Sequence, residues 1–215
     1  MPAALIFDLD GTLVDTVETR IRAWLRVFDE VGIRTTADQV AALIGSDGRS
    51  LASRTADDAG IPIDDQRAEE IDRRAGEIYE ELNRDPQPLP GARDLLISLD
   101  DRGLLWAIAT SSRREQVGRS VAALRLPREP TIVDGSHVEH AKPAPDLLLL
   151  AARALGVEPS ASWYVGDSTW DMLAAVAARM TAIGVTTGSA SADDLRRAGA
   201  SRVIASLNEL AVPHA

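Results

Sequence analysis

Apolar and polar residues follow two different periods along this chain, and the change of period divides it into three stretches. At the N-terminus, a short apolar run over 4–8 predicts a buried strand. Between 17 and 85 the strand pattern is absent, and apolar residues recur three or four positions apart, as on one face of a helix. From 91 onward, apolar runs of strand length alternate with helical patterns, which is typical of α/β folds.

The middle stretch predicts a small bundle of helices. The expected helices cover about 17–31, 36–45, 49–59 and 68–82. Thr36-Ala37-Asp38-Gln39 has the composition of a capping box, so it marks the beginning of the second helix. A stiff, proline-rich segment over 85–91 closes the bundle.

The last stretch predicts a doubly wound, mostly parallel sheet, because alternating strands and helices imply right-handed crossovers. Its expected strands lie near 104–110, 131–134, 162–166 and 181–185, with a weaker one at 202–205, and its expected helices near 92–101, 113–124, 145–155 and 169–178. The strand at 4–8 must join the same sheet. We therefore expect an α/β core of residues 1–15 and 89–215, with an inserted α-helical cap of residues 16–88.

Chemically reactive residues follow the expected strands. Asp8 and Asp10 come directly after the first one, two positions apart, so that their side chains point the same way. Two like charges at the end of a buried strand are costly without a cation, and Mg²⁺ prefers oxygen ligands of this kind. Later runs end at Thr110-Ser111 and at Asp167, with Lys142 between them. Parallel strands would gather all of these at one sheet edge, where α/β folds bind ligands.

This set of residues suits the transfer of a phosphoryl group to a carboxylate. Asp8 is the expected nucleophile. Asp10 would protonate the leaving oxygen and then activate water. Thr110, with the amide of the next residue, Ser111, would hold phosphoryl oxygens, while Lys142 balances the negative charges. Asp167 would bind Mg²⁺ together with the backbone carbonyl of Asp10.

Four ordered motifs resemble those of the haloacid dehalogenase superfamily, namely residues 8–15, 110–111, 142–143 and 166–171. The resemblance covers nearly the whole chain. One departure is Ala141, where many relatives have glycine before the lysine. The helical insertion is similar to the cap of phosphoglycolate phosphatase-like and β-phosphoglucomutase-like members, in which cap residues select the substrate.

Four further residues each have two interpretations. Asp171 is expected at the metal site, although acidic residues are favoured at a helix start in any case. Asp15 is either the N-cap of the first cap helix or part of the cap hinge. Arg49, in the loop over 45–50, either reaches a second anionic group of the substrate or faces solvent. Arg20 is expected to contact the substrate from the first cap helix.

The expected function is a Mg²⁺-dependent phosphatase, similar to phosphoglycolate phosphatase, that acts on a small phosphomonoester. A sugar phosphomutase resembling β-phosphoglucomutase is the alternative, since it uses the same two aspartates. Arg20 stands where those mutases typically carry a histidine, which favours hydrolysis. A phospho-accepting signalling module shares the acidic pocket but has no helical insertion. A dehalogenase would not need Asp10 as an acid.

Composition and charge limit the cellular location and the partners that we expect for this protein. The chain has 215 residues, of which 45% are hydrophobic, enough for one domain with a lid, and it has no cysteine, which excludes disulfides. No apolar run approaches the roughly 20 residues that span a bilayer, and the first strand leaves no room for a signal peptide, so we expect a cytoplasmic protein. A net charge of −10 disfavours nucleic-acid binding. The expected partner is a small phosphorylated metabolite, and the oligomeric state is left open.

Overall fold

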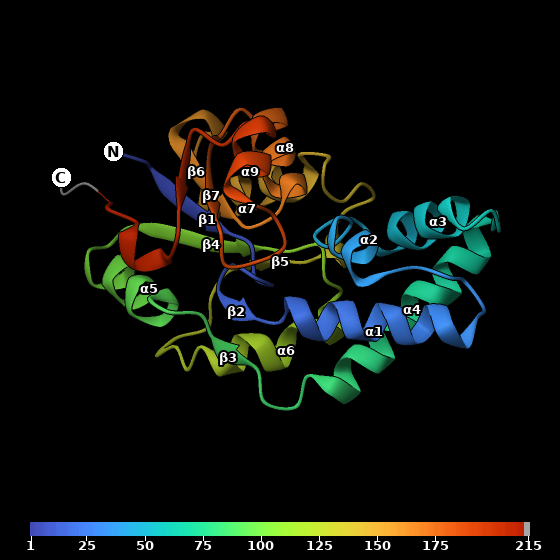
Figure 1. Cartoon of the computed structure of the whole chain (residues 1–215). Coiled ribbons are helices and arrows are strands. Elements are labelled where there is room, and N and C mark those ends of the chain that lie inside the picture. The colour runs from blue at the N-terminus through green and yellow to red at the C-terminus, as the bar shows by residue number, and fades with distance from the viewer. Residues whose placement is uncertain (213–215) are drawn as a thin grey trace.

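A six-stranded parallel sheet forms the centre of the computed structural model, which describes residues 1–212 (Figure 1). The strand order is β5-β4-β1-β6-β7-β8, and each neighbouring pair is parallel. The strands are β1 (Ala4–Phe7), β4 (Leu105–Ala109), β5 (Ile132–Val133), β6 (Ser162–Gly166), β7 (Thr181–Val185) and β8 (Arg202–Ile204). The predicted doubly wound α/β fold is confirmed.

Helices cover both faces of this sheet. One face carries α5 (Ala92–Asp101) and α6 (Arg114–Ala123), and the other carries α7 (Asp146–Leu155), α8 (Thr169–Ala177) and α9 (Ala192–Arg197). Because side chains alternate along a strand, Leu5 and Phe7 of β1 belong to the first apolar layer, whereas Ile6 belongs to the second. All three side chains are fully buried. Each contributes about 1.5–3 kcal/mol of burial, so the end of β1 is firmly held.

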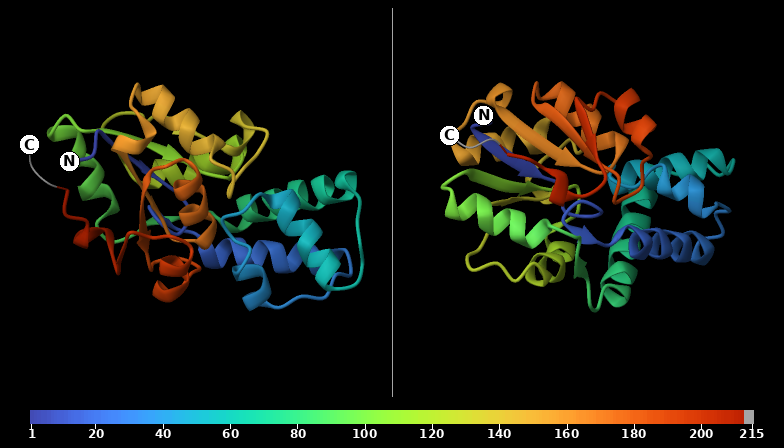
Figure 2. Two further views of the ribbon diagram at one scale, coloured as in Figure 1. Left: turned by 90° about the horizontal axis from the view of Figure 1, so that it is seen from above. Right: turned by 60° about the vertical axis from the view of Figure 1, so that its left-hand side comes forward.

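A helical unit extends from the carboxyl edge of the sheet, as Figures 1 and 2 show. Its helices are α1 (Val17–Glu30), α2 (Ala37–Ala41), α3 (Gly48–Asp58) and α4 (Asp65–Leu82). They share an apolar core of their own, in which the rings of Trp24 and Phe28 stack 5.5 Å apart. The chain enters and leaves this unit through two short antiparallel strands, β2 (Val14–Asp15) and β3 (Gln87–Pro88). We call residues 16–88 the cap.

The local structure differs from the sequence prediction at several points. The capping box at Thr36 is confirmed, but α2 ends at Ala41, four residues before the expected stop. The N-cap interpretation of Asp15 is wrong, because Thr16 occupies the N-cap position and Asp15 pairs with Gln87 in the β2–β3 ribbon. That ribbon and α9 were not predicted, since two-residue strands and a six-residue helix are too short to establish a period.

The outer faces of the helices are charged. On α4, for example, Arg67 pairs with Glu70 at 2.9 Å and Arg73 pairs with Glu77 at 3.1 Å. Exposed pairs of this kind contribute little to stability but keep the surface polar. Within residues 1–212, no helix has both the length and the apolar character to cross a membrane.

Candidate active site

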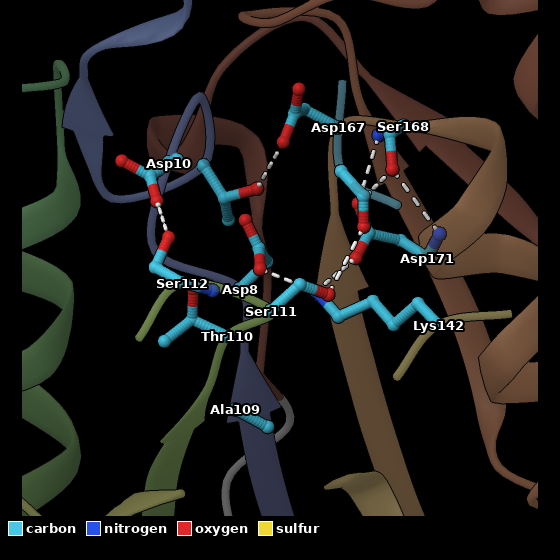
Figure 3. A network of polar contacts seen from close by, with 12 residues as sticks. Asp8, Asp10, Ala109, Thr110, Ser111, Ser112, Lys142, Asp167, Ser168 and Asp171 are labelled. Carbon is cyan, nitrogen blue, oxygen red and sulfur yellow. Dashed lines mark hydrogen bonds and ion pairs between the residues drawn. The ribbon is translucent and has the colours of Figure 1, made fainter. Parts of the chain in front are cut away.

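The carboxyl edge of the sheet faces the cap across a cavity of about 290 Å³. The cavity lies at the topological switch point of the sheet. On one side of β1 lie β4 and β5, and on the other side lie β6, β7 and β8. Its floor is formed by Asp8, Asp10 and Asp167, and by the loop over 110–113 after β4. Figure 3 shows the polar side chains that meet there.

Lys142 links two carboxylates beneath the cavity. Its Nζ donates hydrogen bonds to Asp8 Oδ1 and, at 2.7 Å, to Asp171 Oδ1 (Figure 3). The lysine side chain is fully buried. Burial would lower the pKa of Lys142, but the charges of Asp171 and Asp8 outweigh it and raise this pKa. The ammonium group is therefore a fixed positive charge next to Asp8.

Asp171 is held by donors on both of its oxygens. It occupies the third position of α8, where Ser168 is the N-cap, and its Oδ2 accepts from the amide of Ser168 at 3.0 Å and from its hydroxyl at 2.6 Å. Oδ1 accepts from Lys142 and, at 2.9 Å, from the hydroxyl of Tyr164. These contacts fix the carboxylate and use most of its acceptor capacity.

Asp167 follows the end of β6 and lies in a tight backbone cradle. Its Oδ1 accepts from the Thr12 hydroxyl at 3.0 Å, and its Oδ2 accepts from the Ser189 amide at 3.1 Å. A Cβ atom at Gly188 would lie 1.7 Å from Asp167 Oδ2, and one at Gly11 would lie 2.6 Å from the same atom. Only glycine fits at these two positions, because any side chain would displace the carboxylate.

Asp8, Asp167 and Asp171 form a buried acidic cluster. Each offers a carboxylate oxygen within 4.8 Å of the others, and the only cation that contacts the cluster in the described chain is Lys142. Burial, together with the charges of Asp171 and Asp8, raises the pKa of Asp167 well above its usual value. Full ionisation of the three carboxylates would therefore leave more negative charge than Lys142 can balance, and the cluster offers only oxygen ligands. This donor set fits a hard divalent cation.

The carboxylate of Asp10 is held mainly by cap residues. Oδ1 accepts from the hydroxyls of Thr16 at 2.6 Å and Tyr79 at 3.2 Å, and Oδ2 accepts from Ser112 at 2.7 Å and Arg20 at 2.9 Å. Burial alone would raise the pKa of Asp10. The charge of Arg20 and the hydrogen bonds from Arg20, Ser112 and Thr16 together lower it below its usual value.

Arg20 reaches the site from α1 and lines the cavity. Besides Asp10, its guanidinium contacts Ser112 at 2.6 Å and Gln116 at 3.1 Å, and it lies 3.9 Å from the centre of the Tyr79 ring. Burial would lower the pKa of Arg20, but the charge of Asp10 raises it, so the side chain stays positive. The predicted substrate-binding arginine thus lies against the candidate acid–base residue.

The loop after β4 presents two hydroxyl residues. Thr110 is buried, and its Oγ1 accepts from the Ser112 amide at 3.1 Å, which leaves the hydroxyl proton for another acceptor. The Ser111 hydroxyl donates to the Gly45 carbonyl of the cap at 3.1 Å. A Cβ at Gly45 would lie 2.5 Å from Ser168 Oγ, so the cap loop packs directly on the start of α8.

Arg49 and Arg113 complete the charged wall of the cavity. Arg49 has a half-exposed side chain and lies 3.7 Å from Asp47 and 3.9 Å from Glu69. Arg113 bridges from the core to Glu69, at 2.8 Å, and to Asp72, at 2.6 Å, both on α4.

Sequence reasoning missed four residues that surround these groups: Thr16, Tyr79, Ser112 and Arg113. For Ser112 and Arg113 there was a signal, because they directly follow Thr110-Ser111. Tyr79 looked like an ordinary core residue of its helix.

Comparison with known proteins supports an assignment. Residues 5–185 match the haloacid dehalogenase-like hydrolase family. Phosphoglycolate phosphatase from Pseudomonas putida is 31% identical over 192 residues, which cover 87% of this chain and 71% of that protein. A fructose-1-phosphate phosphatase from Escherichia coli is 32% identical over 185 residues, which cover 85% of this chain and 96% of that protein.

A solved structure and a longer relative extend the comparison. The structure of a hydrolase from Pseudomonas syringae has a TM-score of 0.92 and 35% identity, and the match covers 96% of this chain and 95% of that one. A chloroplast protein of Arabidopsis thaliana, Suppressor of Quenching 1, is 32% identical over 191 residues, but the match spans only 18% of its length and 86% of this chain. The family match covers the strands and loops that build the acidic cluster, so the predicted resemblance is confirmed and this chain is a phosphatase of the haloacid dehalogenase-like hydrolase family.

Proposed function

We propose that this protein is a Mg²⁺-dependent phosphatase that hydrolyses small phosphomonoesters through a phospho-aspartyl intermediate on Asp8. One observation carries the proposal: a cluster of three buried carboxylates, of which Lys142 contacts only two, lies at and just beneath the floor of a metabolite-sized cavity. Such an excess of buried negative charge calls for a divalent cation, and the transfer of a phosphoryl group to a carboxylate uses the same cation.

The residues at the cavity floor would divide the work of binding. Asp8, Asp167 and the backbone carbonyl of Asp10 would hold Mg²⁺. The carboxylate of Asp171 would add negative charge near the ion, and it would help to position Asp8 because Lys142 binds both carboxylates. The bound cation would neutralise charge on the phosphoryl oxygens. Thr110, through its hydroxyl, and the backbone amide of Ser111 would donate hydrogen bonds to those oxygens.

In the first step, a carboxylate oxygen of Asp8 attacks phosphorus, and the ester bond between phosphorus and the leaving oxygen breaks. Asp10 gives its proton to that oxygen, so that an alcohol leaves. Arg20 holds Asp10 ionised in the free site. When the incoming phosphate shares the charge of Arg20, part of the effect that lowers the pKa of Asp10 is removed, and Asp10 takes up from solvent the proton that it gives to the leaving oxygen.

In the second step, water attacks the phosphorus atom of the acyl phosphate. Asp10 takes a proton from this water, and inorganic phosphate leaves while the carboxylate of Asp8 is restored. The proton that Asp10 gains in this second step returns to solvent when the product leaves. The lowered pKa of Asp10 suits this half of the reaction. The cap would act as a lid that excludes water until the alcohol has left. Its contacts with the core, from Ser111 to Gly45 and from Arg113 to α4, support this role.

The proposal is tested by following phosphate release from p-nitrophenyl phosphate and from phosphorylated metabolites, with Mg²⁺ or with EDTA. Turnover is expected with Mg²⁺ only, and Asp8→Asn is expected to abolish it. Asp15→Asn is the matched control, because it removes an exposed carboxylate in β2. Full activity in EDTA would contradict the metal assignment. Conversion of a sugar 1-phosphate to its 6-phosphate with little free phosphate would instead indicate a mutase.

A further inference from the structure

The arginines that line the cavity are already paired with carboxylates of the protein. Three line it within residues 1–212: Arg20, Arg49 and Arg113. Arg20 lies 2.9 Å from Asp10, and Arg113 bridges Glu69 and Asp72 at 2.8 and 2.6 Å. A substrate that carries a second negative charge, besides its phosphate, would need a cation that these pairs do not leave available.

Arg113 is the more firmly held of the two arginines that lie away from Asp10. Its hydrogen bond to Glu69 lowers the pKa of that carboxyl, which keeps Glu69 ionised. Asp72, its other partner, is only 8% exposed. A Cβ at Gly48 would lie 1.9 Å from Asp72 Oδ1, so the start of α3 fixes this carboxylate in place. Arg113 cannot turn to a substrate without leaving a buried carboxylate unpaired.

Arg49 is held more loosely, but its surroundings are acidic as well. Its Nε lies 3.7 Å from Asp47 and 3.9 Å from Glu69, and both carboxylates line the same cavity. A carboxylate of a substrate that approached Arg49 would therefore also approach two like charges. Repulsion from Asp47 and Glu69 would offset the attraction of the arginine.

Hydroxyl groups of a substrate, which carry no charge, would find hydrogen-bond partners in the same wall of the cavity. Asp47 and Glu69 can accept hydrogen bonds from hydroxyls, and so can Ser46, whose own proton goes to the Leu43 carbonyl at 2.6 Å, while the amide of Gln116 can donate or accept. The Trp24 ring adds an apolar surface. At about 290 Å³, the cavity lies near the lower end of the range for ligand pockets, which suits a single small metabolite.

We infer that the substrate is a phosphorylated sugar or polyol, whose part beyond the phosphate carries hydroxyl groups and no second negative charge. Phosphorylated carboxylic acids such as phosphoglycolate are then poor substrates. This inference rests on the proposed function. Sequence similarity does not decide the matter, because the relatives include phosphatases of both kinds. The inference depends instead on the pairing of the cavity arginines with carboxylates of the protein.

The first test compares kcat/KM values for the full chain with Mg²⁺. Phosphoglycolate is measured beside several sugar and polyol monophosphates, with p-nitrophenyl phosphate as a generic substrate. At least one sugar or polyol phosphate is expected to exceed phosphoglycolate by about tenfold or more. If phosphoglycolate equals or exceeds them all, the inference is overturned while the phosphatase proposal stands. No phosphate release from any compound, including p-nitrophenyl phosphate, would overturn both.

A charge variant tests the physical reason. Glu69 neutralises both Arg49 and Arg113, so Glu69→Gln leaves these arginines with less negative charge around them. The kcat/KM ratio of phosphoglycolate to the best sugar phosphate should rise about threefold or more. The matched control is Glu70→Gln on the same helix, since Glu70 pairs with Arg67 at 2.9 Å and does not line the cavity.

Asp47→Asn provides a second variant should Glu69→Gln fail to fold. Asparagine still caps α3, where Asp47 accepts from the Ser50 amide at 3.0 Å, and only the charge beside Arg49 is lost. The same rise in the ratio is expected. An unchanged ratio in a folded variant of either kind would show that wall charge does not select the substrate, and would overturn the inference.

Discussion

Replacing Asp8 by asparagine is expected to stabilise the metal-free protein at pH 8 while removing its activity. Asp8 is 5% exposed. Burial raises its pKa from 3.8 to about 7; Lys142 opposes this effect, and the charges of Asp171 and Asp10 add to it. An acid whose pKa is higher in the folded protein than in the unfolded chain binds more protons when folded. Its contribution to stability is complete below pH 3.8 and is lost as the pH rises through about 7.

The size of this loss of stability follows from the difference between the two pKa values of Asp8, 3.8 in the unfolded chain and about 7 in the folded protein. At about 1.4 kcal/mol for each pH unit, ionisation of Asp8 costs the metal-free fold about 4 kcal/mol by pH 8, and only about 1–2 kcal/mol at pH 5. Asparagine has a similar shape and does not ionise. The free energy of unfolding of Asp8→Asn should therefore exceed that of the native chain by up to about 4 kcal/mol at pH 8, and by much less at pH 5.

Urea unfolding in EDTA, followed by tryptophan fluorescence at pH 5 and pH 8, measures this difference. Asp15→Asn, at an exposed position, should change neither value appreciably. Mg²⁺ at one hundred times its Kd should reduce the difference at pH 8 by up to about 2.7 kcal/mol, since it stabilises the native chain by that amount and the variant binds it less well. A variant that is no more stable than the native chain at pH 8, or a difference that does not depend on pH, would show that burial does not raise the pKa of Asp8.

Three other changes test separate parts of the site. Gly188→Ala would place a Cβ 1.7 Å from Asp167 Oδ2 and should raise the Mg²⁺ concentration needed for half-maximal activity, whereas Gly118→Ala, which meets no atom within 4 Å, should not. Asp10→Asn should slow both formation and hydrolysis of the intermediate in single-turnover experiments; a change in substrate affinity alone would contradict its dual role. Ca²⁺, which prefers larger and looser coordination, should support phosphate release poorly or inhibit it, and equal rates with both ions would argue against a compact oxygen site.

The sequence predicted which residues would meet at the candidate site, because each apolar run shows where a strand ends. Apolar runs ending at Asp8, Thr110 and Asp167 must come together once the strands are parallel, and the structure places these residues around one cavity. The sheet and most of its helices were predicted for the same reason. The period of each apolar run is a local property, so it can be read without knowing the tertiary contacts.

Contacts between the cap and the core could not be predicted in this way. Arg113 and Glu69 are separated by 44 positions, and their pairing depends on how the cap is placed over the sheet. The same holds for Tyr79, whose hydroxyl reaches Asp10 across 69 positions although its ring packs in the cap core. Helical period indicates which face of a helix is buried, but it does not indicate which polar group a buried hydroxyl will meet.

In the proposed reaction, Asp8 carries the phosphoryl group during turnover. The most direct measurement is a rapid acid quench of the native chain with a good substrate and Mg²⁺, followed by mass spectrometry of the peptide that contains Asp8. We expect one added phosphoryl group on Asp8 during turnover, and none when Mg²⁺ is replaced by EDTA. Turnover at an undiminished rate by folded Asp8→Asn, with the phosphoryl group on another residue or on none, would contradict the proposed reaction.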